Sequence, residues 1–208
     1  MNFIQTAGAT CIALICSALA SPVLAGDLPT SKQAKKMLFK AGKKPTEVRF
    51  LREDLIPANM IPAFRMGASM QKYYESLAIS PTEGLRAKSA FQAVNFHSAA
   101  SADRAALAGC NAAKKKKSDD CVVIVQFVPK GYDGPRDFSL SALATADFSR
   151  KYRWARKNKA FAISPETGNW GRALKAKTLE AARAAAIAEC SAMAGGAGDA
   201  GCVVVSEN

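Results

Sequence analysis

The feature that most constrains this chain is a pattern of residues that occurs twice. Residues 76–80 read SLAIS and residues 160–164 read AFAIS, and each stretch continues into a Pro and, three residues later, a Gly. An alanine-rich stretch that ends in Cys follows in both places (AALAGC and AAIAEC), and a short loop then leads to CVVIV or CVVVS. The chain therefore contains one small unit in two copies, over residues 74–128 and 158–208.

Each copy predicts the order strand, strand, helix, strand. The short apolar strand ends at a Pro-x-x-Gly turn, and a second strand follows over Leu85–Phe96 in the first copy and Trp170–Leu174 in the second. Ser98 and Thr178 then suit the N-caps of helices whose small apolar residues recur at helical spacing. We expect the final Val/Ile run to be a central, buried strand in both copies.

These units predict an α+β fold. Two tandem strand–strand–helix–strand units each place a helix on a small, mainly antiparallel sheet, and connecting helices join them. The linker, residues 129–157, begins with a loop rich in Pro and Gly and continues as a helix from Ser139 or Ser141 to about Trp154.

The stretch before the first copy has no counterpart elsewhere in the chain. It predicts a basic amphipathic helix over Ser31–Ala41, a strand over Val48–Leu51 and a helix near Pro62–Tyr73. The expected divisions of the whole chain are a signal peptide at 1–25, a basic N-terminal segment at 26–73, the first unit at 74–128, the linker at 129–157 and the second unit at 158–208.

The first 25 residues have the pattern of an export signal. No charged side chain occurs before Asp27, and the apolar run from Ala7 to Ala20 is short for a membrane span. We expect cleavage after Ala25, with a cut after Ala20 and an uncleaved anchor as alternatives. The protein is therefore expected to be exported, either periplasmic or secreted.

Four cysteines remain after the expected signal, and an exported chain favours their oxidation. Four cysteines allow three pairings, but two copies that fold alike predict Cys110–Cys121 and Cys190–Cys202. A zinc site built from the four thiolates would need close pairs of ligands that this spacing lacks. We expect two disulfides and no metal site.

The charge of the chain points to anionic partners. It has 29 Lys and Arg against 17 Asp and Glu, a formal net charge of +12. Four consecutive lysines lie between the first two paired cysteines and are followed by Asp119 and Asp120, so this loop either binds an anion or is simply solvated. The N-terminal helix either touches an anionic membrane surface or packs on the core with its lysines outward. The candidate anion contacts are Lys114, Lys115, Lys116, Lys117, Lys32, Lys35 and Lys36.

Three further motifs favour structural interpretations. Gly196-x-Gly198-x-x-Gly201 resembles a dinucleotide fingerprint but follows a helix and precedes a strand, the reverse of the required context. His97, beside a predicted N-cap, has no recognisable catalytic partner motif. The mixed basic and aromatic stretch 150–157 suits single-stranded nucleic acid, but export argues against such a partner.

The sequence AFAISPETGNWG, followed by the alanine-rich helix and the cysteine pair, resembles a bacterial family of exported domains of unknown function. The resemblance covers residues 160–208 well. The first copy keeps Ser80-Pro81, Gly84 and both cysteines, but it has Arg86 where the second has Trp170. The resemblance implies an exported bacterial protein with these disulfides, and it implies no activity.

The expected function is that of a non-enzymatic binding or structural module, without a cofactor or a catalytic residue. The alternative is a polyanion or envelope-surface binder whose partner is an anionic lipid, lipopolysaccharide or a wall polymer, bound through the +12 charge. Another envelope protein is also a possible partner. An enzyme of unrecognised type is the remaining hypothesis, since the chain shows no acid–base or nucleophile pair.

Overall fold

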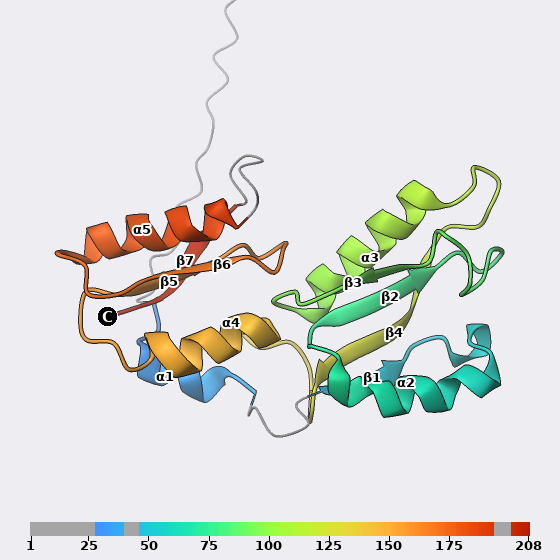
Figure 1. Ribbon diagram of the computed structural model, residues 1–208, viewed down its shortest axis with the longest axis horizontal. Helices are drawn as coiled ribbons and strands as arrows, with labels where there is room; N and C mark the ends of the chain where they lie inside the picture. The colour runs from blue at the N-terminus through green and yellow to red at the C-terminus, as the bar shows by residue number, and fades with distance from the viewer. Residues whose placement is uncertain (1–27, 40–45, 194–200) are drawn as a thin grey trace, which may run out of the picture.

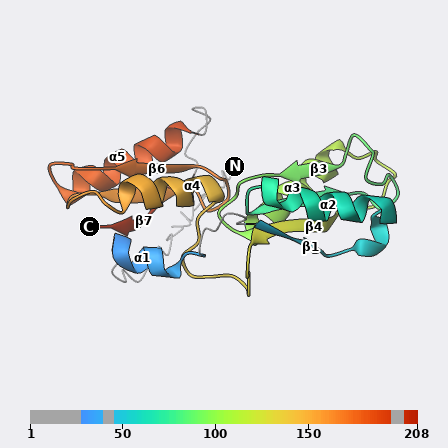
Figure 2. The same cartoon turned by 60° about the horizontal axis from the view of Figure 1, so that its bottom comes forward.

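Two separate antiparallel sheets form the body of the protein, as a computed structural model shows for residues 28–39, 46–193 and 201–208. The sheets lie side by side in Figures 1 and 2, each with a long helix across one face. The predicted α+β class is confirmed, and the two units do not share a sheet. The expected signal peptide, residues 1–25, lies outside the described residues.

Sheet A has the strand order β1-β4-β2-β3 and sheet B the order β6-β5-β7. The strands are β1 (Thr46–Phe50), β2 (Glu75–Ile79), β3 (Phe91–Ala93), β4 (Val122–Pro129), β5 (Ala160–Ile163), β6 (Trp170–Ala173) and β7 (Val203–Glu207). The α-helices are α1 (Ser31–Met37), α2 (Ile61–Gly67), α3 (Ala99–Ala113), α4 (Ala142–Asp147) and α5 (Leu179–Ala192). The shorter helical turns are η1 (Glu53–Leu55), η2 (Ala58–Met60) and η3 (Ala68–Met70), together with the π-helical turn η4 (Phe148–Tyr152).

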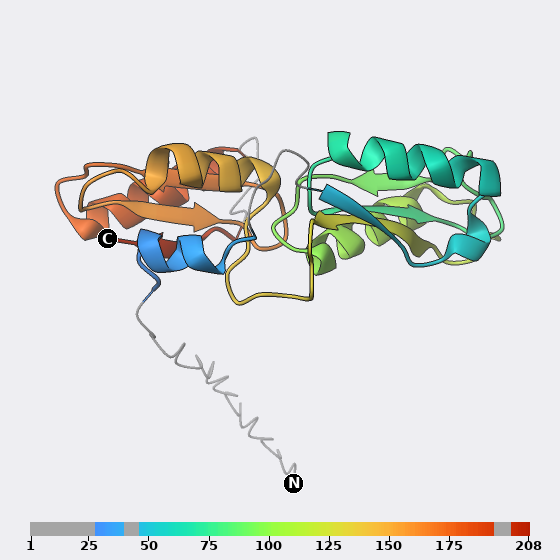
Figure 3. The same ribbon diagram turned by 90° about the horizontal axis from the view of Figure 1, so that it is seen from below.

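Both sheets are covered on both faces. Helix α3 packs on one face of sheet A, and α2 with the turns before it packs on the other. Helix α5 packs on one face of sheet B, while α4 and α1 share the opposite face (Figure 3). Apolar side chains on both faces of each sheet are buried by this arrangement, which is the main source of its stability.

Small residues let the long helices lie close to the strands. Ala102 and Ala106 of α3 are fully buried, as are their counterparts in α5. In each copy the helix and a neighbouring strand come closest at a glycine, which lies on the helix in copy one and on the strand in copy two. A Cβ on Gly109 of α3 would lie 2.6 Å from the Phe91 ring, whereas a Cβ on Gly171 of β6 would lie 2.2 Å from the Ala186 carbonyl oxygen of α5. In copy one the strand carries a large side chain that lies over the helix glycine. In copy two the strand itself has the glycine, and the helix backbone lies directly against it.

The expectation of a central final strand is right for β4 and wrong for β7. Strand β4 lies between β1 and β2, whereas β7 is at the edge of sheet B. The difference comes from residues outside the copies, because β1 pairs antiparallel with the outer side of β4. Among the described residues no strand pairs with the outer side of β7.

Several expected elements are shorter than the pattern suggested. The strand expected over 85–96 is reduced to β3, because residues 85–90 form two successive turns in which Ala87 and Ala90 donate to Gly84 and Ala87. The helix expected over Ser31–Ala41 ends at Met37, and residues 40–45 lie outside the described residues. The linker helix begins after its N-cap Ser141 and becomes π-helical at Phe148.

A buried lysine holds α1 and the linker helix together. Lys159 is 3% exposed, and its ammonium donates to the carbonyl oxygens of Tyr152, Arg153 and Ala155 and to Ser31 Oγ, at 2.8–3.2 Å. These carbonyls lie at the end of the helical segment, where a positive charge is favourable. Burial lowers the pKa of Lys159, so the hydrogen bonds compensate a real desolvation penalty.

We therefore expect Lys159→Met to lower the free energy of unfolding by about 2 to 3 kcal/mol, because buried carbonyls lose their donor. Lys157→Met is the matched control: this exposed neighbour should change stability by less than about 0.5 kcal/mol. Urea unfolding followed by circular dichroism measures both. Equal effects would contradict the structural role of Lys159.

Candidate functional site

Each long helix is tied to the strand that follows it by a disulfide. Cys110 at the end of α3 bonds Cys121, and Cys190 near the end of α5 bonds Cys202. These are the pairs expected from the two copies. The first disulfide closes the loop that carries the four lysines, and such a constraint restricts the loop in the unfolded chain as well as in the folded one.

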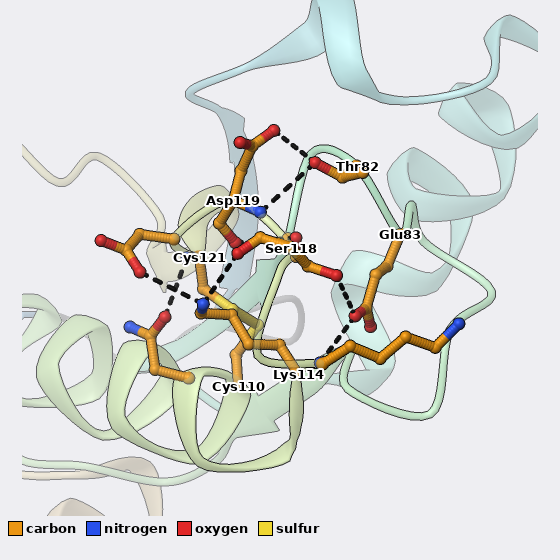
Figure 4. Close-up of polar contacts among 11 residues, drawn as sticks. Thr82, Glu83, Cys110, Lys114, Ser118, Asp119 and Cys121 are labelled. Carbon is orange, nitrogen blue, oxygen red and sulfur yellow. Dashed lines mark hydrogen bonds and ion pairs between the residues drawn. A yellow bond between two sulfur atoms is a disulfide. The ribbon is translucent and has the colours of Figure 1, made fainter.

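The lysine loop, residues 114–118, is also bound to the turn after β2. The carboxylate of Glu83 accepts hydrogen bonds from the Lys115 N–H at 2.8 Å, from the Ser118 hydroxyl at 2.6 Å and from the Ser89 hydroxyl. Figure 4 shows Glu83 directed into this loop beside the disulfide. The hydrogen bonds from Ser118, Ser89 and Lys115 lower the pKa of Glu83 to about 2, so the carboxylate is ionised across the physiological range.

A second set of bonds fixes the end of the same loop. Asp119 takes a hydrogen bond from the Thr82 hydroxyl through its carboxylate, and its carbonyl oxygen accepts from Ser80 Oγ at 2.8 Å. The Asp119 N–H in turn donates to Thr82 Oγ1 at 3.3 Å. Glu83 and Asp119 therefore join the two segments, because each carboxylate binds the segment opposite its own.

The two loops enclose a surface hollow of about 920 Å³. Its cations come from both sides: Arg86 and Lys88 from the turns before β3, and Lys115 and Lys117 from the lysine loop. None of these four is in an ion pair with another described residue. Hydroxyl and apolar groups complete the lining of this lysine-loop hollow, which consists of Thr82, Glu83, Arg86, Ala87, Lys88, Ser89, Ala113, Lys115, Lys117 and Ser118.

The structure separates the four consecutive lysines into different roles. Lys114 is turned inward: its side chain is 13% exposed, and its ammonium donates to the Ser118 carbonyl oxygen at 2.8 Å and pairs with Asp120 at 3.3 Å. Lys114 is therefore held within its own loop, and its expected role in anion contact stays a prediction. Lys115 and Lys117 line the hollow, while Lys116 is exposed but is not part of the lining.

The lysines of α1 lie in a different part of the molecule. Lys35 and Lys36 line a second hollow of about 550 Å³, together with Lys130 and Arg136 of the linker. Lys32 is exposed and does not line it. The seven expected anion contacts therefore do not form one site, and three of them, Lys32, Lys114 and Lys116, line neither of these two hollows.

Sequence reasoning missed Glu83, Arg86 and Lys88. The signal that could have found the two cations is the difference between the copies, because four extra residues separate Gly84 from the N-cap in copy one. The lysine loop is likewise particular to copy one. Cations that occur in one copy and not in the other point to a site that the second copy lacks.

His97 joins the two units. It is 2% exposed, its Nε2 lies 2.8 Å from the Asn169 carbonyl oxygen, and its Nδ1 accepts from the Ser141 N–H at 3.0 Å. Only the neutral ring protonated at Nε2 satisfies both partners. The His97 carbonyl oxygen also accepts from the Ser139 hydroxyl. Both ring nitrogens are engaged, and burial lowers the pKa of His97 to about 4.

Other contacts accompany His97 where the units meet, near the centre of Figure 1. Arg104 of α3 forms a bidentate pair with Glu166 of the β5–β6 turn, at 2.7–3.0 Å. Asn95 accepts from the Leu143 N–H at 3.1 Å, and its carbonyl lies against Gly168, where a Cβ would be 2.2 Å away. The turn that binds the lysine loop in copy one thus contacts the other unit in copy two.

Two other motifs singled out in the sequence are the basic and aromatic stretch and the glycine motif. In the basic and aromatic stretch 150–157, Tyr152 is fully buried, while Trp154 is exposed with the Arg153 guanidinium 4.0 Å from its ring centre. Of the glycine motif, Gly196 and Gly198 lie outside the described residues and Gly201 precedes β7 with φ +61°. No group of three possible metal ligands occurs among residues 28–39, 46–193 and 201–208.

The described helices include none that is long and apolar enough to cross a membrane.

Comparison of the chain with models of known protein families, with curated proteins and with solved structures finds no match. The site must therefore be interpreted from its own residues.

The His97 geometry predicts a specific loss of stability in acid. The folded-state pKa of about 4 lies below the ordinary value of 6.5, so its contribution is fully present above pH 6.5 and is lost as the pH falls toward 4. The loss amounts to about 3 kcal/mol at low pH. Urea unfolding at a series of pH values should show that His97→Asn, although less stable at neutral pH, lacks this component. An unchanged pH profile in the variant would contradict it.

Proposed function

We propose that this chain is an exported, disulfide-stapled module without enzymatic activity that binds an anionic polymer or surface of the cell envelope at the lysine-loop hollow. The observation that carries the proposal is the composition of the hollow. Four cations that form no ion pair with a described residue line it, against a single carboxylate among the lining residues, Glu83, whose oxygens accept three hydrogen bonds from the protein.

The geometry favours an anion over other ligands. Arg86, Lys88, Lys115 and Lys117 converge from two loops, and the hydroxyls of Thr82 and Ser118 lie among them. Phosphate, sulfate and carboxylate groups accept hydrogen bonds from such donors, and charge-assisted bonds are stronger than neutral ones. Bringing four like charges together raises the local potential, which a bound anion relieves.

The hollow is held open by bonds that do not involve the ligand. The disulfide, Glu83 and Asp119 fix the two loops before any ligand arrives, so less conformational entropy is lost on binding. A binding role, in contrast to a catalytic one, is supported by His97, whose two ring nitrogens are both engaged by the backbone. Export is supported by the N-terminal pattern and by the two disulfides.

Removing two cations from the hollow should weaken anion binding while leaving the fold intact. In the oxidised mature protein we expect Lys115→Gln with Lys117→Gln to reduce affinity for tripolyphosphate and for lipopolysaccharide by about tenfold or more, measured by isothermal titration calorimetry. The slope of log affinity against log salt should become shallower by roughly one for each lysine that no longer neutralises a phosphate.

The matched control is Lys157→Gln with Lys177→Gln, which removes the same charge from exposed positions in and beside the second unit. It should change affinity by less than about twofold at physiological salt, because exposed charges beyond the Debye length are screened. If the control weakens binding as much as the hollow variant, net charge alone is responsible and the proposed site is wrong.

A further inference from the structure

The second basic hollow, here called the linker hollow, has a different construction. Lys35 and Lys36 at the end of α1 face Lys130, Gly131 and Arg136 across it, with Leu38 and Phe39 completing the lining. The Arg136 guanidinium lies 3.4 Å from the centre of the Phe39 ring and donates to the Met37 carbonyl oxygen at 3.1 Å. The linker and α1, 99 residues apart in sequence, are thus joined at this site.

The positive charge of the linker hollow is poorly compensated. Among the described residues, the Lys35 ammonium donates a hydrogen bond to the neutral Ser149 hydroxyl, at 3.1 Å, and forms no ion pair. Burial together with the nearby Arg153 charge lowers its pKa. Two carboxylates lie close by: Asp133 is 3.5 Å from Arg136, and Glu47 accepts from the Gly131 N–H at 3.2 Å. Lys36 and Lys130 have no ion pair with a described residue.

The two hollows lie on parts of the chain that are joined by direct contacts between the two units. The lysine-loop hollow belongs to the first unit, and the linker hollow is lined by residues of α1 and the linker. Helices α1 and α3, which precede the residues concerned or carry them, lie at different parts of the molecule in Figure 1. His97, the Arg104–Glu166 pair and the Asn95 contacts join the units between them. When two sites are joined in one molecule, binding at the second becomes intramolecular once a single ligand is long enough to reach both.

We infer that the linker hollow is a second anion-binding site, and that the two hollows together bind one long polyanion chain. The inference rests on the proposed function of the first hollow. It specifies the ligand class as a linear polymer with repeated anionic groups, because a single small anion fills one hollow without gaining from the other. Each hollow alone binds weakly, and the long chain binds with the combined strength of both.

A length series of linear polyphosphate tests this inference. With polymer chains in excess, the affinity per chain should rise in proportion to length for short chains. A longer chain offers more phosphate groups that can occupy one hollow, so the number of equivalent ways to bind increases. The affinity should then exceed that proportion by at least about tenfold once a chain spans both hollows. Tripolyphosphate, which has three phosphate groups, should occupy the lysine-loop hollow alone and should show no gain in affinity from the linker hollow.

Lys36→Gln with Lys130→Gln should remove the excess for long chains and leave tripolyphosphate binding at the lysine-loop hollow unchanged. Both side chains are exposed and outside the core, so the fold is expected to persist. The matched control, Lys32→Gln with Lys157→Gln, removes two charges from exposed positions that line neither hollow, one of them on α1 itself. It should keep the excess.

The outcomes separate the two proposals. If the unmodified protein does not bind tripolyphosphate, the proposed function is wrong. If it binds tripolyphosphate but affinity for long chains rises only in proportion to length, the first hollow stands and the second site is wrong. An excess that both double variants lose equally would also overturn the second site, since general charge would then explain it.

Discussion

The close packing of two alanine-rich helices on their sheets is the constraint on which the rest of the structure depends. Ala106 and Ala186 are fully buried because α3 and α5 lie against the strands with no larger side chain between them. That approach brings the cysteine at each helix end within bonding distance of the next strand. In copy one the disulfide closes the lysine loop, Glu83 binds the closed loop, and the cations of both loops then meet around one hollow.

The two copies have the same order of elements but different polar contacts. In copy one, Asp103 of α3 accepts from Gln126 of β4, whereas in copy two Arg183 of α5 pairs with Glu207 of β7. Buried ionisable side chains of opposite type stand at equivalent positions where the copies begin. Glu75, the first residue of β2, accepts hydrogen bonds from Gln92 and the Lys72 N–H, and Lys159, the residue before β5, donates to carbonyl oxygens. The surface turns differ as well. The turn after β2 binds the lysine loop, and the β5–β6 turn contacts the neighbouring unit.

Local patterns predicted the elements within the copies, because helical spacing, N-caps and paired cysteines depend on neighbouring residues. Ser98 and Thr178 cap α3 and α5 as expected. The features that were not predicted come partly from a long-range strand pairing and partly from local turns, such as those that replace the strand expected over residues 85–90. The edge position of β7 depends on β1 pairing only with β4, and the division of the lysines depends on whether Ser118 and Asp120 turn Lys114 inward. His97 could be recognised as a poor candidate for a catalytic base, but its place between the units could not be predicted from adjacent residues.

The most direct test of the account is whether a small anion binds at the lysine-loop hollow while the first disulfide is intact. Backbone amide shifts of the oxidised protein should be followed by NMR during a tripolyphosphate titration. The account predicts that the largest shifts fall on Thr82, Ser89, Lys115, Lys117 and Ser118, and that selective loss of the Cys110–Cys121 bond in a double Ala variant weakens them. Shifts spread evenly over the basic residues of both units, or unchanged without that disulfide, would contradict it.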